Sequence, residues 1–140
     1  MKMLVPVDGS EYSMKAVKSA CDLAKAQPFS SLTLLAVSIE LPELEEGKYI
    51  ADKMKFQAEV ALNKAKTLAA DKEPGIKVGT ILATGASPAE EIVRVAKDQK
   101  ADLIVIGSRG LAGKTSSFLG STASKVVTYS PCSVLVVKSD

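Results

Sequence analysis

The sequence predicts a single α/β domain built on a parallel sheet. Five short apolar runs alternate with stretches in which apolar residues recur at three- and four-residue spacing, the spacing of one helix face. Several of these runs are apolar on consecutive residues, which is typical of strands covered on both faces. The 140 residues show no repeat, boundary or low-complexity segment, and this length suits one domain with a substantial core. Strands alternating with helices indicate βαβ units.

Apolar patterns and capping signals place the elements along the chain. The expected strands are Met3–Val7, Leu32–Ile39, Ile76–Ala83, Leu103–Ile106 and Ser133–Val137. The apolar stripes of four expected helices are Ala16, Val17, Ala20, Cys21 and Ala24; Ile50, Met54, Ala58, Ala61, Leu62, Ala65, Leu68 and Ala69; Ile92, Val93 and Ala96; and Ala123, Val126 and Val127. Ser87-Pro88-Ala89-Glu90 is a capping box that begins the third helix, and Ser130-Pro131 ends the fourth. The acidic segment Leu41–Lys48 is expected to be a mobile loop.

The composition argues against several classes of function. A formal net charge of +2 implies no general attraction to nucleic acid or to a membrane surface. The three tyrosines and three phenylalanines are scattered, so they form no recognisable surface for stacking single strands. Cys21 and Cys132 lie far apart and the chain has no histidine, which argues against a zinc site. Without a membrane-spanning apolar stretch or a signal-peptide pattern, we expect a cytoplasmic protein with reduced thiols.

A glycine-rich loop between Gly107 and Ser121 is the most informative segment of the chain. Glycine, serine and threonine crowd it, and Arg109 and Lys114 are its only charged residues. Glycines allow a ligand to approach backbone N–H groups, and the loop leads into the N-terminus of a helix, which favours anions. Between Leu103 and Ser139 there are four basic residues and no acidic one. The loop is therefore predicted to hold an anion, with a nucleotide phosphate as the obvious candidate.

The ends of two strands point to the place of this site in the fold. Asp8 follows the first expected strand, and the glycine-rich loop follows the fourth. In an open parallel sheet, ligands bind beyond the carboxyl ends of the strands, where the strand order reverses. If these two strands are neighbours, Asp8 faces the loop.

Other interpretations of the loop are weaker. Ser108 to Thr115 almost match the P-loop pattern, but serine replaces the first glycine, and no acidic residue follows before Asp140 to hold magnesium. A flavodoxin-like carrier would need its phosphate loop directly after the first strand, where Asp8 and Glu11 would repel phosphate. Simple turn-forming glycines, a helix-capping Asp8 and a capping Ser121 remain open as structural alternatives. If Ser10 caps the first helix, the Asp8 side chain can turn toward a ligand.

With these motifs in order, the chain resembles the universal stress protein family over its whole length. Gly107, Gly110, Gly120 and Ser121 match the family's nucleotide-binding signature, G-x2-G-x9-G-[ST]. Four blocks along the chain resemble the family in the same order. They are Leu4–Ser10, Gly85–Val93, Ala101–Gly110 and Ser130–Val137.

The resemblance implies an open doubly wound sheet of five parallel strands in order 3-2-1-4-5, and it implies membership of the subset that binds ATP, accompanied by Mg²⁺ or Mn²⁺. Asp8 would contact adenine, Pro6 and Val37 would shape that pocket, and Ile106 and Gly107 would line the nucleoside side. Ribose and phosphates would be held by Arg109, Gly110, Gly120, Ser121 and Thr122. The resemblance also implies a homodimer through the closing strand, whose apolar edge, Val134 to Val137, needs covering.

The expected function is a nucleotide-dependent regulatory module of the stress response rather than an enzyme. The loop offers hydroxyls, Arg109 and Lys114 but no histidine, Asp or Glu to activate water, so any hydrolysis of ATP should be slow. A slow ATPase and a dimeric interaction protein with an empty loop are the two alternatives. The chain departs from many family members at Ala36, where histidine is common, and at Lys114, where an apolar residue is common.

Overall fold

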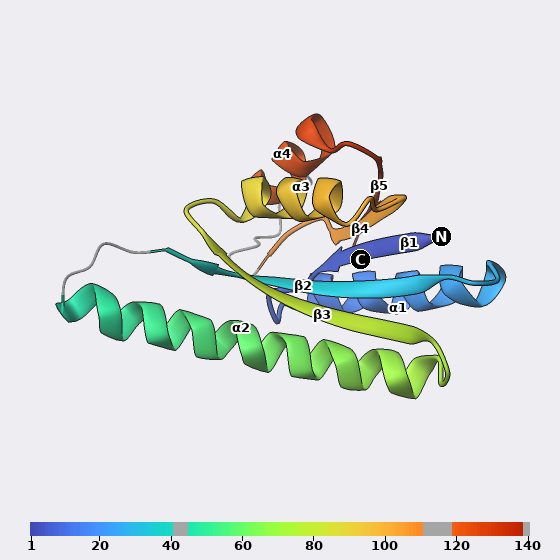
Figure 1. Cartoon of the computed structure of the whole chain (residues 1–140), viewed down its shortest axis with the longest axis horizontal. Helices are drawn as coiled ribbons and strands as arrows, with labels where there is room; N and C mark the ends of the chain where they lie inside the picture. The colour runs from blue at the N-terminus through green and yellow to red at the C-terminus, as the bar shows by residue number, and fades with distance from the viewer. Residues whose placement is uncertain (41–44, 111–118, 139–140) are drawn as a thin grey trace.

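The computed structural model describes residues 1–40, 45–110 and 119–138. Its centre is a five-stranded parallel sheet in the order β3-β2-β1-β4-β5, the order that the resemblance implied (Figure 1). The strands are β1 (Lys2–Pro6), β2 (Ser31–Ile39), β3 (Lys77–Gly85), β4 (Leu103–Gly107) and β5 (Ser133–Val137). The expected strands are confirmed to within one or two residues at their ends.

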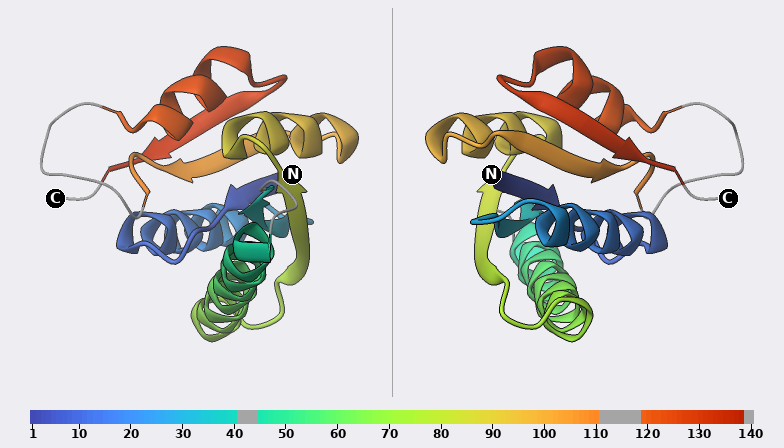
Figure 2. Two further views of the ribbon diagram at one scale, coloured as in Figure 1. Left: turned by 90° about the vertical axis from the view of Figure 1, so that its left-hand side faces the viewer. Right: turned by 90° about the vertical axis from the view of Figure 1, so that its right-hand side faces the viewer.

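Four helices cover the two faces of the sheet. They are α1 (Glu11–Ala26), α2 (Glu45–Lys72), α3 (Pro88–Asp98) and α4 (Ser121–Tyr129). The end-on views in Figure 2 show α1 and α2 on one face and α3 and α4 on the other. The prediction of a loop over Leu41–Lys48 was wrong from Glu45 onward, because α2 begins there. Residues 41–44 lie outside the described part. Glutamates are good helix formers and favour the positive end of the helix dipole, which explains the early start.

The consecutive apolar residues of the strands supply a core on each face. Leu34 of β2 and Val5 of β1 belong to the core under α1 and α2. Leu35 and Leu4, their neighbours in sequence, belong to the core under α3 and α4. All four side chains are essentially fully buried. This is why the strands lack the alternation of a half-exposed sheet.

Side-chain caps start two of the helices. Ser10 is the N-cap of α1, where its hydroxyl accepts a hydrogen bond from the Ser13 N–H at 3.1 Å. Ser87 caps α3 by accepting from the Glu90 N–H at 3.4 Å, with Pro88 at the first helical position, as the capping box predicted.

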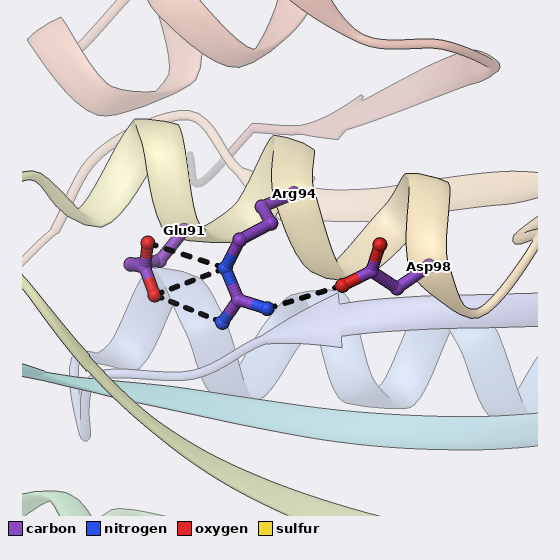
Figure 3. Close-up of polar contacts among 3 residues, drawn as sticks. All are labelled: Glu91, Arg94 and Asp98. Atoms are coloured by element: carbon purple, nitrogen blue, oxygen red, sulfur yellow. Dashed lines mark hydrogen bonds and ion pairs between the residues drawn. The ribbon is translucent and has the colours of Figure 1, made fainter.

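An exposed ion-pair chain runs along α3. Figure 3 shows Arg94 between two carboxylates on the same helix, 2.9 Å from Glu91 and 3.1 Å from Asp98. Hydrogen bonding to Glu91 raises the pKa of Arg94 further above its ordinary value. Because Arg94 is exposed, these two ion pairs contribute little to the stability of the fold. The Glu91 stem lies close to Gly85 at the end of β3, where a β-carbon would come within 2.6 Å of it.

Candidate functional site

A cavity of about 560 Å³ opens at the carboxyl ends of the strands. It lies where β1 and β4 are neighbours, paired through Met3 with Leu103 and Leu4 with Ile104. The chain leaves β1 for α1 on one face of the sheet and leaves β4 toward α4 on the other. This is the switch point of the sheet, so the expectation that the loop after the first strand meets the loop after the fourth is confirmed.

All ten residues proposed from the sequence as nucleotide contacts line this one cavity. They are Pro6, Asp8, Val37, Ile106, Gly107, Arg109, Gly110, Gly120, Ser121 and Thr122. They come from the ends of β1, β2 and β4 and from the start of α4. Lys114 belongs to residues 111–118, which lie outside the described part.

Asp8 lies between the end of β1 and the glycine-rich loop. One carboxylate oxygen, Oδ1, accepts a hydrogen bond from the Ser10 N–H at 2.9 Å. The other, Oδ2, points at Gly110, because a β-carbon on residue 110 would come within 2.6 Å of it. Ser10, and not Asp8, is the N-cap of α1. The structural alternative of a helix-capping Asp8 was therefore wrong.

Two further glycines of the signature, Gly107 and Gly120, lie close to backbone atoms of other segments. A β-carbon on Gly107 would lie 2.8 Å from the backbone of Tyr12 in α1. A β-carbon on Gly120 would lie 3.2 Å from the Ser108 carbonyl oxygen. Sequence reasoning attributed these glycines to ligand approach or, as the structural alternative, to turn formation. The structure adds that β4, α1 and the two ends of the loop come too close together for a side chain.

The two ends of the glycine-rich loop are joined by a hydrogen bond. The Gly120 N–H donates to the Ser108 carbonyl at 2.7 Å, and the Ser108 N–H donates to the Val137 carbonyl of β5 at 2.9 Å. Ser108 is buried. The start of α4 is thereby held next to the end of β4.

The N-terminus of α4 has local features that favour an anion. Gly120 is the N-cap and supplies no side-chain hydrogen bond, and the first turn contains no acidic residue. Ser121 is the first residue of the helix, so the alternative in which Ser121 caps it was wrong. The first intrahelical bond comes from the Ser124 N–H to the Gly120 carbonyl. The preceding N–H groups therefore lie at the positive end of the helix, beside the Ser121 and Thr122 side chains that line the cavity.

Sequence reasoning missed further lining residues, including everything that α2 contributes to the cavity. Most of the additional lining residues are apolar: Val7, Leu35, Ala36, Ile39, Met54, Ala58, Pro88, Ile92, Leu119 and Ala123. Ser13 and Gln57 are the polar ones. Met54 and Ala58 were recognised as parts of a helical stripe, but the pattern gives no sign of which turn of a 28-residue helix reaches the cavity.

The cavity is divided by chemistry. Its charged lining residues, within the described part of the chain, are Asp8 and Arg109. Main-chain and hydroxyl donors gather at the α4 end, and apolar side chains gather near β2, α2 and α3. Residues 1–40, 45–110 and 119–138 contain no group of three Cys, Asp or Glu side chains placed to hold a metal ion. No helix within the same ranges could span a membrane.

The fold and the cavity define a doubly wound α/β protein with a cavity at its switch point, where ligands of such folds bind. The model of the universal stress protein family matches residues 1–138. The chain belongs to the universal stress protein family.

Two relatives align with almost the whole of this chain. Universal stress protein YxiE of Bacillus subtilis is 39% identical over 152 aligned positions, which cover 98% of this chain and 98% of that protein. A universal stress protein of Methanocaldococcus jannaschii is 37% identical over 141 positions, which cover 98% of this chain and 81% of that protein.

Solved structures share the architecture. Universal stress protein UspA from Lactobacillus plantarum superposes with a TM-score of 0.83 at 28% identity, covering 98% of this chain and 97% of that one. A universal stress protein solved in complex with cAMP has a TM-score of 0.75 at 28% identity, with 98% and 96% covered. Structures from Archaeoglobus fulgidus with dAMP and Arabidopsis thaliana with AMP, at 21% and 18% identity, share the fold.

Proposed function

We propose that this protein binds an adenine nucleotide in the cavity at the switch point and acts as a nucleotide-dependent regulatory module of the stress response. The observation that carries the proposal is the meeting of all ten sequence-selected residues around one cavity whose two ends differ in chemistry. The phosphates lie at the N-terminus of α4, near Arg109, and the base lies against the apolar residues near β2. A volume of about 560 Å³ is within the usual range for small-molecule sites.

The related structures support the choice of an adenine nucleotide. The neighbours in complex with cAMP, dAMP and AMP share the fold of this chain, and their ligands have an adenine base and a phosphate in common. The apolar walls suit the base, while the N-terminus of α4 and Arg109 suit the phosphate.

The physiological ligand is proposed to be ATP, with Mg²⁺ or Mn²⁺. Asp8 is the one carboxylate among the described lining residues, and its Oδ1 already accepts a hydrogen bond from the Ser10 N–H. A divalent ion would therefore be held mainly by the phosphate oxygens. The same scarcity of carboxylates, together with the lack of histidine in the chain, favours binding over hydrolysis.

We further propose that the protein is cytoplasmic and that it forms a homodimer through β5. This strand is at one edge of the sheet, and Leu135 is 38% exposed on it. An uncovered apolar edge strand favours pairing with a second copy.

Leu135→Lys should shift the protein to a monomer in sedimentation velocity at micromolar concentration. Thr80→Lys, at an exposed position on the opposite edge strand β3, is the control and should leave the dimer intact. A wild-type monomer at high micromolar concentration would exclude the interface.

The experiment that tests the nucleotide site is denaturing release of ligand from freshly purified protein, read by mass spectrometry, combined with calorimetric titration of AMP and of ATP with magnesium. We expect recovered adenine nucleotide, or saturable binding with about one site per chain. Protein that releases no nucleotide and gives no heat with either ligand would contradict the proposal. Turnover of several ATP molecules per second would instead contradict its regulatory, non-enzymatic part.

A further inference from the structure

Gln57 places a carboxamide at the apolar end of the cavity. It lines the cavity from α2 together with Met54, one turn earlier on the same side of the helix, and with the adjacent Ala58. Ala58 is buried, which fixes this turn of α2 against the rest of the protein, whereas the Gln57 side chain is exposed at the cavity. The helix therefore presents one polar group beside an apolar wall.

The other polar side chains on this side of the cavity are already engaged. The Ser13 hydroxyl donates to the Ser10 carbonyl at 2.9 Å and accepts from the Asp8 N–H at 3.4 Å. Asp8 Oδ1 accepts from the Ser10 N–H, and its Oδ2 faces Gly110. Gln57 makes no side-chain hydrogen bond to any residue in the described part of the chain. Its amide N–H groups and carbonyl oxygen are thus available to a ligand.

The position of Gln57 relative to the anion-binding end indicates which part of a nucleotide it meets. The helix α2 lies on one face of the sheet and α4 on the other (Figure 2). A ligand whose phosphate lies at the start of α4 must cross the carboxyl edge of β1, past Asp8, to reach α2. Gln57 then meets the base.

We propose that Gln57 is a specificity-determining residue that reads the amino edge of adenine; this inference rests on the proposed function. A carboxamide presents a donor and an acceptor side by side. Adenine offers the complementary pair, since its 6-amino group donates and the adjacent ring nitrogen accepts. A purine that lacks the 6-amino group can make only one of these two hydrogen bonds. The site should therefore prefer a 6-aminopurine.

The test compares, by calorimetry, the affinities of wild-type protein and of Gln57→Leu for two ligands. The ligands are AMP and purine riboside 5′-monophosphate, which keeps the ring and lacks the amino group. Wild-type protein should prefer AMP by roughly tenfold, within the range measured for bidentate amide–adenine pairs. Gln57→Leu should remove most of that preference, and should change the affinity for inorganic tripolyphosphate by less than about twofold, because its partners lie at α4.

The matched control is Asn63→Leu, which replaces an exposed amide on the same helix that does not line the cavity. It should keep the wild-type preference for AMP. A Gln57→Leu protein with an undiminished preference would overturn the role of Gln57 while leaving the nucleotide site in place. Wild-type protein that binds AMP and the deaminated analogue equally would do the same. Wild-type protein that binds neither would overturn both the inference and the proposed function.

Discussion

The Asp8 carboxylate occupies the space that a side chain on residue 110 would need. A β-carbon there would lie 2.6 Å from Asp8 Oδ2, closer than van der Waals contact allows. The residue at the end of β1 and the glycine-rich loop after β4 are therefore fitted to each other, although about a hundred positions separate them in the sequence. Gly110 is required by Asp8, in addition to any contact that it makes with a ligand.

This contact makes the effect of Gly110→Ala depend on Asp8. In the wild-type background, the new methyl group should displace the carboxylate and weaken its hydrogen bond to the Ser10 N–H, at a cost of about 1 kcal/mol in the free energy of unfolding. In an Asp8→Ala background the space is open, and the same substitution should cost little. Urea unfolding of the four proteins measures the coupling. Additive costs would show that Asp8 and Gly110 do not interact.

The packing of Gly107 against α1 gives a second prediction. A β-carbon at this position meets backbone atoms of Tyr12 at 2.8 Å, and backbone cannot move aside as the end of a side chain can. Gly107→Ala should therefore lower the free energy of unfolding by about 2 kcal/mol, as overpacking does. Gly79→Ala is the matched control, because the space around Gly79 in β3 is open, and it should be neutral. Equal unfolding midpoints for the two variants would contradict the tight approach of β4 to α1.

Local signals in the sequence allowed the elements of the fold to be predicted, whereas the strand order and the ligand contacts came from the resemblance to the family. Consecutive apolar residues in the strands, the capping box at Ser87 and the glycine signature each reflect a nearby structural requirement. Asp8 could be placed opposite the loop because ligands in open parallel sheets bind at the switch point.

The wall formed by α2 could not be predicted in the same way. Which turn of the helix reaches the cavity depends on where α2 begins and how it crosses β2, and its start at Glu45 was itself missed. The close approach of Gly107 to Tyr12 could not be predicted either, because a glycine in a signature reveals nothing about the backbone packed against it. These features arise from tertiary packing rather than from local pattern.

Cys21 gives a prediction about pH. Burial raises the pKa of its thiol above the ordinary 9.0, and the neighbouring Asp22 adds to the shift. At high pH the unfolded chain loses this proton while the folded protein retains it, so the free energy of unfolding should fall as the pH rises above about 9. We expect a smaller fall for Cys21→Ala than for wild type in urea unfolding with reductant, between about pH 8 and 10. Cys132→Ala is the control, because it removes the other thiol and leaves the buried Cys21 thiol in place. Parallel pH dependences for wild type and Cys21→Ala would exclude this contribution.

Gly120→Val tests whether the junction between the loop and α4 binds the phosphate. The larger side chain would press on the Ser108 carbonyl oxygen at 3.2 Å and on the Arg109 Cα at 3.3 Å, and it should separate the Gly120 N–H from Ser108. The N–H groups at the start of α4 would then move away from Arg109. We expect AMP affinity to fall at least about tenfold, equivalent to one or two lost hydrogen bonds, in calorimetric titration. Gly79→Val, in open space on β3, should bind AMP as wild type does. A cooperatively folded Gly120→Val protein with wild-type affinity would remove this junction from the nucleotide site.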